Sequence, residues 1–352
     1  MATVNGKQAI HLCSNDYLGL SQNKRVVEKT TRALRQVSQC SSRLIAGNDP
    51  AILELEALLA SHRKTESALV YPTGYAANLG VITALADKNT AIFSDELNHA
   101  SIIDACRLSG ATVKIFKHND SDHLENLLTQ SSGRKIIVTE GVFSMDGDSA
   151  NLREISKATE KHDAITVVDD AHGDFVMGPE FSGAPADAGV NVDVHISSMS
   201  KGLGCFGGYV AASDKIRELL INTSRQFIYT SALPDHLCVS AIAAIPIAKK
   251  GHLQKKLYRN ISHFKKNMTG LGFSLGNSSS QIIPILVGDE KKSVLLSQTL
   301  LEEGVFAQAV RYPTVKKGSA RLRVSLTAMH TLKHIDIALS CFEQAGKKLQ
   351  II

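Results

Sequence analysis

The organising stretch of this 352-residue chain reads Thr166-Val-Val-Asp-Asp-Ala-His-Gly173. Its first residues continue an apolar, β-branched run that starts at Ile165, which is typical of a buried strand. Two carboxylates and a histidine follow at once, so the strand delivers them to its own carboxyl end. We expect a functional site there, because ligands of parallel α/β sheets bind beyond the carboxyl ends of the strands.

Three kinds of site could use two acids and a histidine in this position. A metal centre would need more ligands, and the sequence offers no HExxH, HxH or paired Cys/His spacing to supply them. A hydrolase triad would need a nucleophile elbow, and we assign none. The third is a cofactor site, in which Asp169 holds a protonated ring nitrogen and His172 contacts the same ring.

A second stretch favours the cofactor site, and it reads Ser197-Ser-Met-Ser-Lys-Gly-Leu-Gly-Cys-Phe-Gly-Gly208. Its lysine, Lys201, follows a strand and can form a Schiff base with an aldehyde. The serines before it can bind a phosphate, and the glycines after it let a bulky ring approach the backbone. Lys201 alone would be interpreted as a surface lysine in a flexible loop. Together with Asp169 and His172 it predicts a pyridoxal phosphate site.

The same loop contains a glycine pattern typical of dinucleotide binding, from Gly202 to Gly207. That pattern should open a helix, with an acid about 20 residues later. Here residues 208–212 have the pattern of a strand, and no acid lies near position 227. We therefore give the loop no nucleotide-binding role.

Strand and helix patterns alternate through the middle of the chain. Buried strands are expected at residues 91–93, 112–116, 135–139, 165–168 and 192–197, with helices between them at 101–109, 121–130 and 151–162. This alternation predicts an α/β fold with a mostly parallel sheet flanked by helices. An earlier helix should begin at Pro50, because Asp49 can cap it and proline is favoured in its first position.

The pattern changes after about residue 240, which suggests a second domain. A basic helical stretch runs to about residue 268, strands follow at 282–287 and 320–326, and a last helix starts near 331. We expect a short N-terminal segment (residues 1–40), a large cofactor-binding domain (41–240) and a smaller C-terminal α+β domain (241–352).

Composition excludes several classes of function. Hydrophobic residues form 43% and charged residues 21% of the chain, which is ordinary for a globular protein and excludes disorder or a collagen-like fold. The most apolar run, residues 238–248, is too short to span a bilayer, so no membrane role is expected. Six widely spaced cysteines and the lack of an apolar leader favour a reducing, cytoplasmic location. The basic last third is interpreted as a solvated face and not as a nucleic-acid surface, since Trp is absent.

Eight stretches spread over nearly the whole chain resemble the α-oxoamine synthases, a family of pyridoxal-phosphate enzymes. They are Ser14–Leu20, Ser42–Asn48, Pro72–Asn78, Asn98–Ser101, Thr139–Asp148, Asp169–His172, Ser198–Gly208 and Gly318–Ala328. The resemblance implies fold type I, the aspartate aminotransferase-like architecture, with pyridoxal 5'-phosphate as cofactor. It also implies an acyltransferase that condenses a small amino acid with an acyl thioester and releases carbon dioxide.

The resemblance assigns roles to four residues around the cofactor ring. Lys201 would form the Schiff base and then move the Cα proton of the substrate. Asp169 would pair with the pyridine nitrogen, and His172 would hydrogen-bond the phenolic oxygen of the ring. His99 would stack on the ring face, although as a lone residue it would be interpreted as a loop histidine.

The resemblance also places the cofactor phosphate at the start of a helix. Gly74 and Tyr75 would offer backbone amides there, where the partial positive charge of a helix N-terminus favours anions. Ser198 would bind the same phosphate. Ser231, with Thr230, would reach it from a second subunit, which implies a homodimer with a shared active site.

Substrate residues are implied in two parts of the chain. Arg323 would bind the carboxylate of the amino acid as a fork, and Arg311 and Asn15 are further substrate candidates. Ser144 would lie near the ring and the substrate carbonyl. Arg321, two residues before Arg323, is expected to point to the opposite face of its strand and to be structural.

Within the family, residues 140–148 and 321–330 look most like the members that join L-alanine to a pimeloyl thioester in biotin biosynthesis. Members that use glycine and an acetyl thioester share much of both stretches and remain an alternative. A non-catalytic subunit that binds pyridoxal phosphate is the alternative from another class, although such subunits typically lose the lysine that is present here as Lys201. The expected partners are therefore an amino acid and an acyl thioester of coenzyme A or of a carrier protein.

Overall fold

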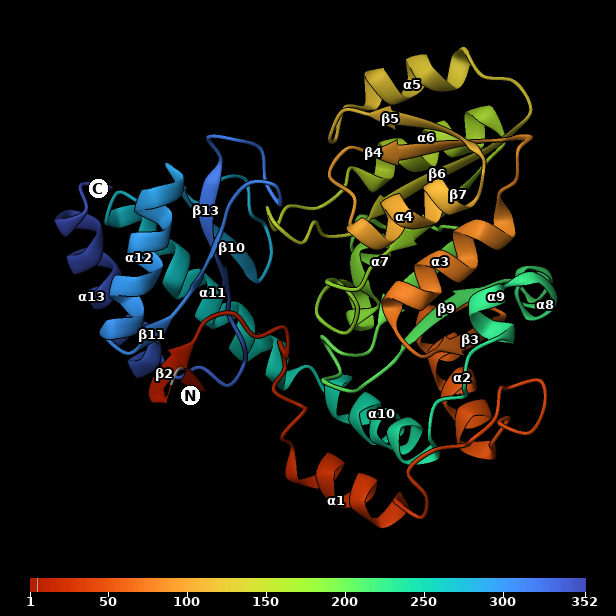
Figure 1. Cartoon of the computed structure of the whole chain (residues 1–352), viewed down its shortest axis with the longest axis horizontal. Coiled ribbons are helices and arrows are strands. Elements are labelled where there is room, and N and C mark those ends of the chain that lie inside the picture. The colour runs from red at the N-terminus through yellow and green to blue at the C-terminus, as the bar shows by residue number, and fades with distance from the viewer. Residues whose placement is uncertain (5) are drawn as a thin grey trace. The chain divides into compact units, whose positions relative to one another are not determined.

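The computed structural model describes residues 1–4 and 6–352, and the chain divides into two compact units (Figure 1). Unit 1 comprises Met1–Gly19, Ser144–Ser149 and Gly251–Ile352, and unit 2 comprises Leu20–Phe143 and Ala150–Lys250. The expected boundary at residue 241 falls inside helix α10 (Asp235–Ala248), which belongs to unit 2. The first 19 residues, expected as part of a separate segment, belong to unit 1 because a strand near their start pairs with one near residue 305.

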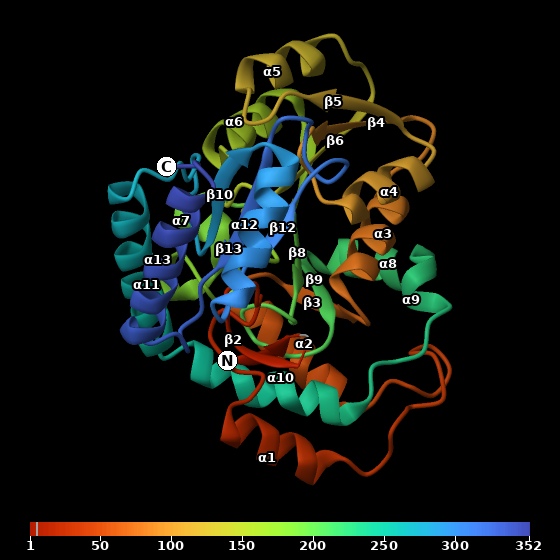
Figure 2. The ribbon, with the colours of Figure 1, turned by 60° about the vertical axis from the view of Figure 1, so that its left-hand side comes forward.

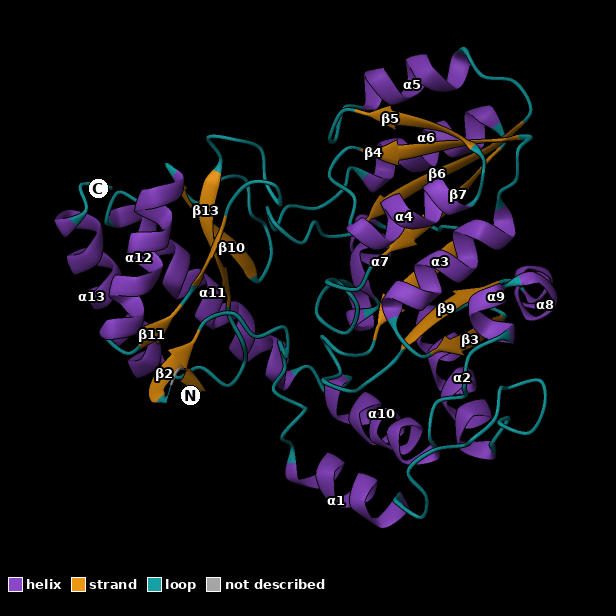
Figure 3. Cartoon of the chain, in the orientation of Figure 1, coloured by secondary structure: helices purple, strands orange, loops and turns teal. Residues whose placement is uncertain are grey.

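Unit 2 is built on a seven-stranded sheet (Figure 3). In spatial order its strands are β3 (Ser67–Tyr71), β9 (Gly208–Ala212), β8 (Val194–Ser198), β7 (Ala164–Asp169), β6 (Arg134–Glu140), β4 (Thr90–Asp95) and β5 (Thr112–Phe116). The five strands from β8 to β5 pair in parallel, whereas β9 is antiparallel to both of its neighbours. The prediction of a mostly parallel sheet is therefore confirmed.

Helices surround this sheet in unit 2, some on its faces and others packed on those helices (Figure 3). They are α1 (Lys24–Ala33), α2 (Pro50–Arg63), α3 (Gly74–Leu85), α4 (Ala100–Leu108), α5 (Ser121–Thr129), α6 (Leu152–His162), α7 (Gly183–Ala188), α8 (Asp214–Thr223), α9 (Arg225–Ile228) and α10, with a short 3-10 turn at Pro179–Phe181. An apolar cluster lies between the sheet and α3 and α4, and Val81, Ile102, Ile136 and Val167 are completely buried in it. Within the described residues, none of the helices is both long and apolar enough to cross a membrane.

Helix α2 begins where the sequence predicts. Asp49 caps it, since its Oδ1 accepts a hydrogen bond from the backbone N–H of Ala51 at 2.8 Å, and Pro50 occupies the first turn. The helix ends at Lys64, which adopts a left-handed conformation with φ 58°. This ending leaves His62 and Arg63, two polar residues of the last turn, buried inside unit 2.

Strand β5 corrects one expectation. Residues 112–116 are predicted as a buried strand, but only Phe116 is buried and the residues before it are exposed or half-buried. The reason is its place in the sheet together with its cover, because β5 is an edge strand, whereas β3 at the opposite edge is buried where α2 packs against it. An apolar run therefore marks the strand without showing how deeply it is buried.

Unit 1 contains two small sheets and three helices (Figure 2). One sheet has the order β1 (Ala2–Val4), β2 (Lys7–His11) and β11 (Val305–Phe306), and the other has the order β10 (Ile282–Gly288), β13 (Ala320–Ser325) and β12 (Gln308–Val310). Helix α13 (Leu332–Lys348) packs against α11 (His252–Gly270) and α12 (Glu290–Glu302). The predicted strands near 282 and 320 and the helices around them are thus present.

Candidate functional site

Two of the predicted residues meet at the carboxyl end of the large sheet. His172 follows β7 and Lys201 follows β8, and these neighbouring parallel strands end at the same edge. The Lys201 Nζ lies 2.9 Å from the His172 Nε2. His172 is buried and Lys201 is half-buried. The imidazole can therefore hold the lysine amine in one direction.

Asp169, the last residue of β7, is fixed by two hydrogen bonds. Its Oδ1 accepts from the backbone N–H of Ala171 at 3.0 Å, and its Oδ2 accepts from the side-chain amide of Asn78 at 2.6 Å. Asn78 lies on α3 and is buried. The sequence analysis gave Asn78 no role, although an asparagine in a mostly apolar helix is a signal that could have identified it.

His99 is joined to this group through a chain of hydrogen bonds. Its Nδ1 lies 2.7 Å from the hydroxyl of Ser101 and accepts from the Ser101 backbone N–H at 3.2 Å, which caps helix α4. The Ser101 hydroxyl in turn accepts from Asn78 at 3.0 Å. Burial lowers the pKa of His99, and the nearby Asp169 carboxylate only partly offsets this effect. A neutral imidazole whose Nδ1 accepts carries its hydrogen on Nε2.

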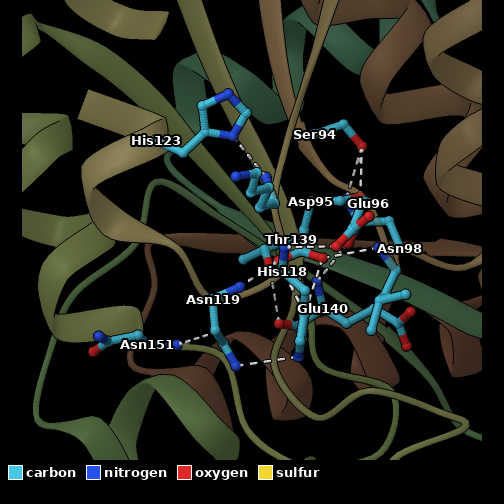
Figure 4. Close-up of polar contacts among 12 residues, drawn as sticks. Ser94, Asp95, Glu96, Asn98, His118, Asn119, His123, Thr139, Glu140 and Asn151 are labelled. Atoms are coloured by element: carbon cyan, nitrogen blue, oxygen red, sulfur yellow. Dashed lines mark hydrogen bonds and ion pairs between the residues drawn. The ribbon is translucent and has the colours of Figure 1, made fainter. Parts of the chain in front are cut away.

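The residue before His99 anchors its loop to the sheet, as Figure 4 shows. The side-chain amide of Asn98 donates to the Ser94 hydroxyl at 2.9 Å and to the Val138 carbonyl at 2.8 Å. Its oxygen accepts from the backbone N–H of Glu140 at 3.0 Å. The carboxyl ends of β4 and β6 therefore fix the position of the backbone that leads into His99.

Glu140 is a buried carboxyl group beside Asp169. The two residues are partners in the β6–β7 register, and Glu140 is only 2% exposed. Its Oε1 has no hydrogen-bond partner among the described residues. Burial raises the pKa of Glu140 well above its usual value, and the Asp169 charge raises it further.

The start of α3 forms a cradle with the loops after β8. A Cβ on Gly208 would meet the backbone nitrogen of Gly74 at 2.4 Å, and a Cβ on Gly74 would meet the Ser198 Cβ at 3.0 Å. Glycine is thus required at position 208 for the helix end to come this close. The first backbone N–H groups of a helix have no partner within it, so Gly74 and Tyr75 suit an anion.

This donor set fits pyridoxal phosphate. Lys201 supplies an amine for the aldehyde, Asp169 an acid for the ring nitrogen, and the amide end of α3 a place for the phosphate. Ser231, predicted to act from a second subunit, is exposed and forms an isolated bridge with Ser42. Its role towards the cofactor stays a prediction.

The predicted substrate residues form a second set, within unit 1. The Arg323 Nε donates to the backbone oxygen of Ser144 at 2.6 Å, and its Nη1 donates to Asn15 Oδ1 at 3.3 Å and to the Ser325 hydroxyl at 2.9 Å. Three of these residues, Arg323, Asn15 and Ser144, were named from the sequence. Arg311 is exposed in the loop that follows β12.

Arg321 does not point away from Arg323, so that expectation is wrong. Residues two apart in a strand lie on the same face. Arg321 forms an ion pair with Asp146, while Arg323 donates to Ser144 two residues earlier. The residue between the two arginines, Leu322, is completely buried.

A motif that the sequence interpretation passed over runs from Gly272 to Gly276 and has the GxSxG spacing of a nucleophile elbow. An elbow requires a strand before the serine and a helix after it. Here the motif follows helix α11 and precedes strand β10, and Ser274 forms a bridge with Leu286. Its context is therefore not that of a hydrolase.

Comparison with known proteins agrees with this geometry. Residues 7–342 match the model of the family described as aminotransferase class I and II. The 8-amino-7-oxononanoate synthase of Thermoanaerobacter pseudethanolicus is 43% identical over 99% of this chain and 90% of its own length. The enzyme of the same name from Marinobacter nauticus is 42% identical over 99% of this chain and 90% of its own length.

Solved structures extend the comparison. Sphingomonas wittichii serine palmitoyltransferase matches with a TM-score of 0.97 and 32% identity, covering 100% of this chain and 90% of that one. The 8-amino-7-oxononanoate synthase of Francisella tularensis matches with a TM-score of 0.83 and 26% identity, covering 97% and 98%. The chain therefore belongs to the aminotransferase class I and II family and, within it, to the pyridoxal-phosphate-dependent α-oxoamine synthases of fold type I.

Proposed function

We propose that the chain catalyses the reaction for which its relatives are named, the synthesis of 8-amino-7-oxononanoate. L-Alanine and a pimeloyl thioester are joined, and carbon dioxide and the free thiol are released, as a step of biotin biosynthesis. The observation that carries the proposal is the contact of 2.9 Å between Lys201 Nζ and His172 Nε2. His172 follows β7, the strand that ends in Asp169, and Lys201 follows the neighbouring strand β8. Identity of 43% over 99% of the chain supports the choice of substrates.

When bound, pyridoxal phosphate supplies an electron-withdrawing ring that makes the Cα proton of the amino acid removable. Asp169 would hold the ring nitrogen and His172 the ring oxygen. His99 would cover the ring face, and an Nε2–H on its neutral imidazole would be free to orient a substrate oxygen. The amides of Gly74 and Tyr75, with the Ser198 hydroxyl, would hold the phosphate.

Lys201 moves the proton in this proposal. Its Nζ takes the Cα proton of alanine, so that the Cα can attack the thioester carbonyl and expel the thiol. The product then loses the original carboxylate as carbon dioxide, and Lys201 returns a proton to the same carbon. His172 orients the Nζ during both transfers, and Arg323 binds the carboxylate of the amino acid until it leaves.

We further propose that the active form is a homodimer and that it is cytoplasmic. Ser231 is exposed and Thr230 is half-buried, so a second subunit can take up the Ser231 hydroxyl at its phosphate site. All six cysteines lie in the described part of the chain and are free, which supports a reducing compartment. Neither an acidic nucleic-acid partner nor a membrane surface is needed for this reaction.

The test is an absorbance titration of the purified protein. Pyridoxal phosphate is added first, and L-alanine, glycine and L-serine are then added in turn. We expect a cofactor band that requires Lys201, is absent in Lys201→Ala, and responds to L-alanine at the lowest concentration. The product should then form from a pimeloyl thioester, and coenzyme A and carrier-protein esters can be compared directly.

Two other outcomes would change the assignment. A response at lower concentration to glycine, with product from an acetyl thioester, would make the chain a glycine acyltransferase. No cofactor band in a folded protein would reject catalysis and leave a non-catalytic subunit. Asp169→Asn checks the mechanism, because it should leave the fold intact and reduce turnover sharply, whereas normal turnover would remove Asp169 from its role.

A further inference from the structure

A buried arginine that the proposed reaction does not use lies behind the cofactor residues. Arg63 ends helix α2, and its side chain is 0% exposed. Its Nη1 donates to Asp170 Oδ2 at 2.8 Å and to the backbone oxygen of Ser182 at 2.6 Å. Its Nη2 lies 3.0 Å from Asp174 Oδ1, and its Nε donates to the Tyr209 hydroxyl at 2.9 Å. One guanidinium therefore joins several segments of unit 2.

Two of these partners, Asp170 and Asp174, belong to the segment that carries the ring-binding residues. Asp170 is next to Asp169 in the chain, and Asp174 comes two residues after His172. Arg63 thus binds this segment on both sides of His172. Any movement of the segment along its own direction would break at least one of the two ionic contacts.

Other bonds extend the same network to the lysine and phosphate segments. Asp174 Oδ2 accepts from the Ser197 hydroxyl at 2.7 Å and from the Tyr209 hydroxyl at 2.6 Å. Ser197 precedes Ser198, and Tyr209 follows Gly208, the glycine that packs against the start of α3. The three segments that carry predicted cofactor residues are therefore all bound to one buried ion cluster, formed by Arg63, Asp170 and Asp174.

The backbone packs closely around the two carboxylates of this cluster. A Cβ on Gly183 would lie 1.7 Å from Asp170 Oδ2, and a Cβ on Gly173 would lie 2.3 Å from Oδ1 of the same side chain. A Cβ on Gly202, the residue after Lys201, would lie 2.4 Å from the backbone oxygen of Asp174. Glycine at each position lets the backbone close around the two carboxylates.

The Arg63 charge acts on both carboxyl groups of the cluster. Burial raises the pKa of Asp174, but the Arg63 charge and the hydrogen bond from His62 outweigh it and bring the pKa to about 2. Burial raises the pKa of Asp170, with Arg63 opposing. Removing such charges from water is costly, and well-packed apolar residues often serve stability as well or better. Stability alone therefore does not account for this cluster.

We propose that Arg63 is a positioning residue for the cofactor site. Through Asp170 and Asp174 it sets the position of Asp169 and His172, and through Asp174 and Ser197 it ties that segment to the strand end that carries Lys201. It touches neither substrate nor cofactor. The inference rests on the proposed function, because it assumes that these residues hold pyridoxal phosphate.

The experiment compares the cofactor-loaded wild type with Arg63→Lys, Asp174→Asn and Tyr209→Phe. A lysine keeps the charge but cannot reach Asp170, Asp174 and Tyr209 at once, because its donors share one nitrogen. Tyr209→Phe removes one hydroxyl and keeps the ring, so it serves if the ionic variants fail to fold. Four quantities are measured: the cofactor absorbance and its pH midpoint, the cofactor dissociation constant, kcat and KM for L-alanine, and urea unfolding without cofactor.

Glu56→Gln is the matched control. Glu56 is also buried, and its carboxylate accepts two hydrogen bonds from the buried Arg43. Oε1 accepts from Nη1 at 2.8 Å, and Oε2 accepts from Nη2 at 3.2 Å. Its Oε1 also accepts from the backbone N–H of Val70, at 2.8 Å. The control therefore removes the same kind of buried charge, and its hydrogen-bond partners, Arg43 and Val70, lie outside residues 169–174, 197–202 and 208–209.

We expect the Arg63 and Asp174 variants to shift the pH midpoint, to weaken cofactor binding and to lower kcat by about 100-fold, the scale of a misplacement near 1 Å. KM for L-alanine should change little. The control should unfold at lower urea but keep the wild-type absorbance, midpoint and kcat. Tyr209→Phe should show the same shift at smaller size.

Three results overturn the inference. The first is that the folded variants keep the wild-type midpoint and kcat, which would leave Arg63 a purely structural role. The second is that Glu56→Gln shifts the midpoint as much as Asp174→Asn, which would show a general effect of lost stability. The third is that the wild type itself shows no cofactor band. This result rejects the proposed function as well, and it differs from the first two because it is seen without any variant.

Discussion

Replacing Glu140 by Gln should change how the stability of the cofactor-free protein depends on pH. Glu140 is 2% exposed, and its Oε1 lacks a hydrogen-bond partner among the described residues. Burial raises the pKa of its carboxyl group, and the charge of Asp169 on the next strand adds to the effect. The folded protein therefore keeps a proton there at pH values where the unfolded chain has lost it.

The sign and the size of the effect follow from proton linkage. Above about pH 4.3, the ordinary value of a glutamate, the unfolded chain binds fewer protons at this position than the folded protein. The free energy of unfolding then falls as pH rises, by at most about 1.4 kcal/mol for each pH unit. Gln resembles the neutral acid and does not titrate. Relative to the wild type, Glu140→Gln should therefore become steadily more stable across the pH range that begins at this ordinary value.

The assay is urea unfolding of the cofactor-free protein at several pH values across this range, followed by circular dichroism and by tyrosine fluorescence. Titrating groups that do not interact with Glu140 are common to both proteins, so they cancel in the difference between the two free energies. Glu54→Gln, which removes an exposed carboxylate of α2, controls for the change in net charge. A difference that stays constant with pH would show that Glu140 is ionised in the folded protein, and the argument from its burial would fail.

Three further predictions concern local structure and the substrate. Asp49→Ala removes the cap that accepts from Ala51 at 2.8 Å, so urea unfolding should show a loss of about 1 kcal/mol; no loss would mean that the cap is not needed. Gly147→Ala places a Cβ 2.0 Å from the backbone oxygen of Ile282 at φ +68°, so the melting temperature should fall clearly, and an unchanged value would contradict the close approach. Arg323→Lys cannot bind a carboxylate as a fork, so KM for L-alanine should rise about tenfold, or about 1.4 kcal/mol; an unchanged KM would remove Arg323 from the substrate site.

The strands of the large sheet could be predicted because their signal is local. Apolar runs with flanking glycine or polar residues mark β7, β8 and β9, and the predicted strand at 208–212 is β9 itself. Depth in the sheet is not local information. It depends on which strands are neighbours, and so the exposure of β5 at the sheet edge could not be predicted from its own residues.

The candidate site shows the same division between local and distant information. Lys201 and His172 could be expected to meet, because each follows a strand and the carboxyl ends of parallel strands share one edge. Asn78 and Arg63 escaped the sequence analysis because their partners are remote. Asn78 lies 91 residues from Asp169, and Arg63 lies 107 residues from Asp170. A single sequence gives a buried polar residue no visible partner at such separations.

The pair Asp169-Asp170 illustrates how the two kinds of information combine. Consecutive residues of an extended chain point to opposite sides. Asp169 meets Asn78 on α3, on the side where the predicted cofactor residues gather, and Asp170 meets Arg63 at the end of α2. One carboxylate is thus available for chemistry and the other for holding it in place. Two adjacent acids would repel each other if both faced one pocket, and the strand separates them by its geometry alone.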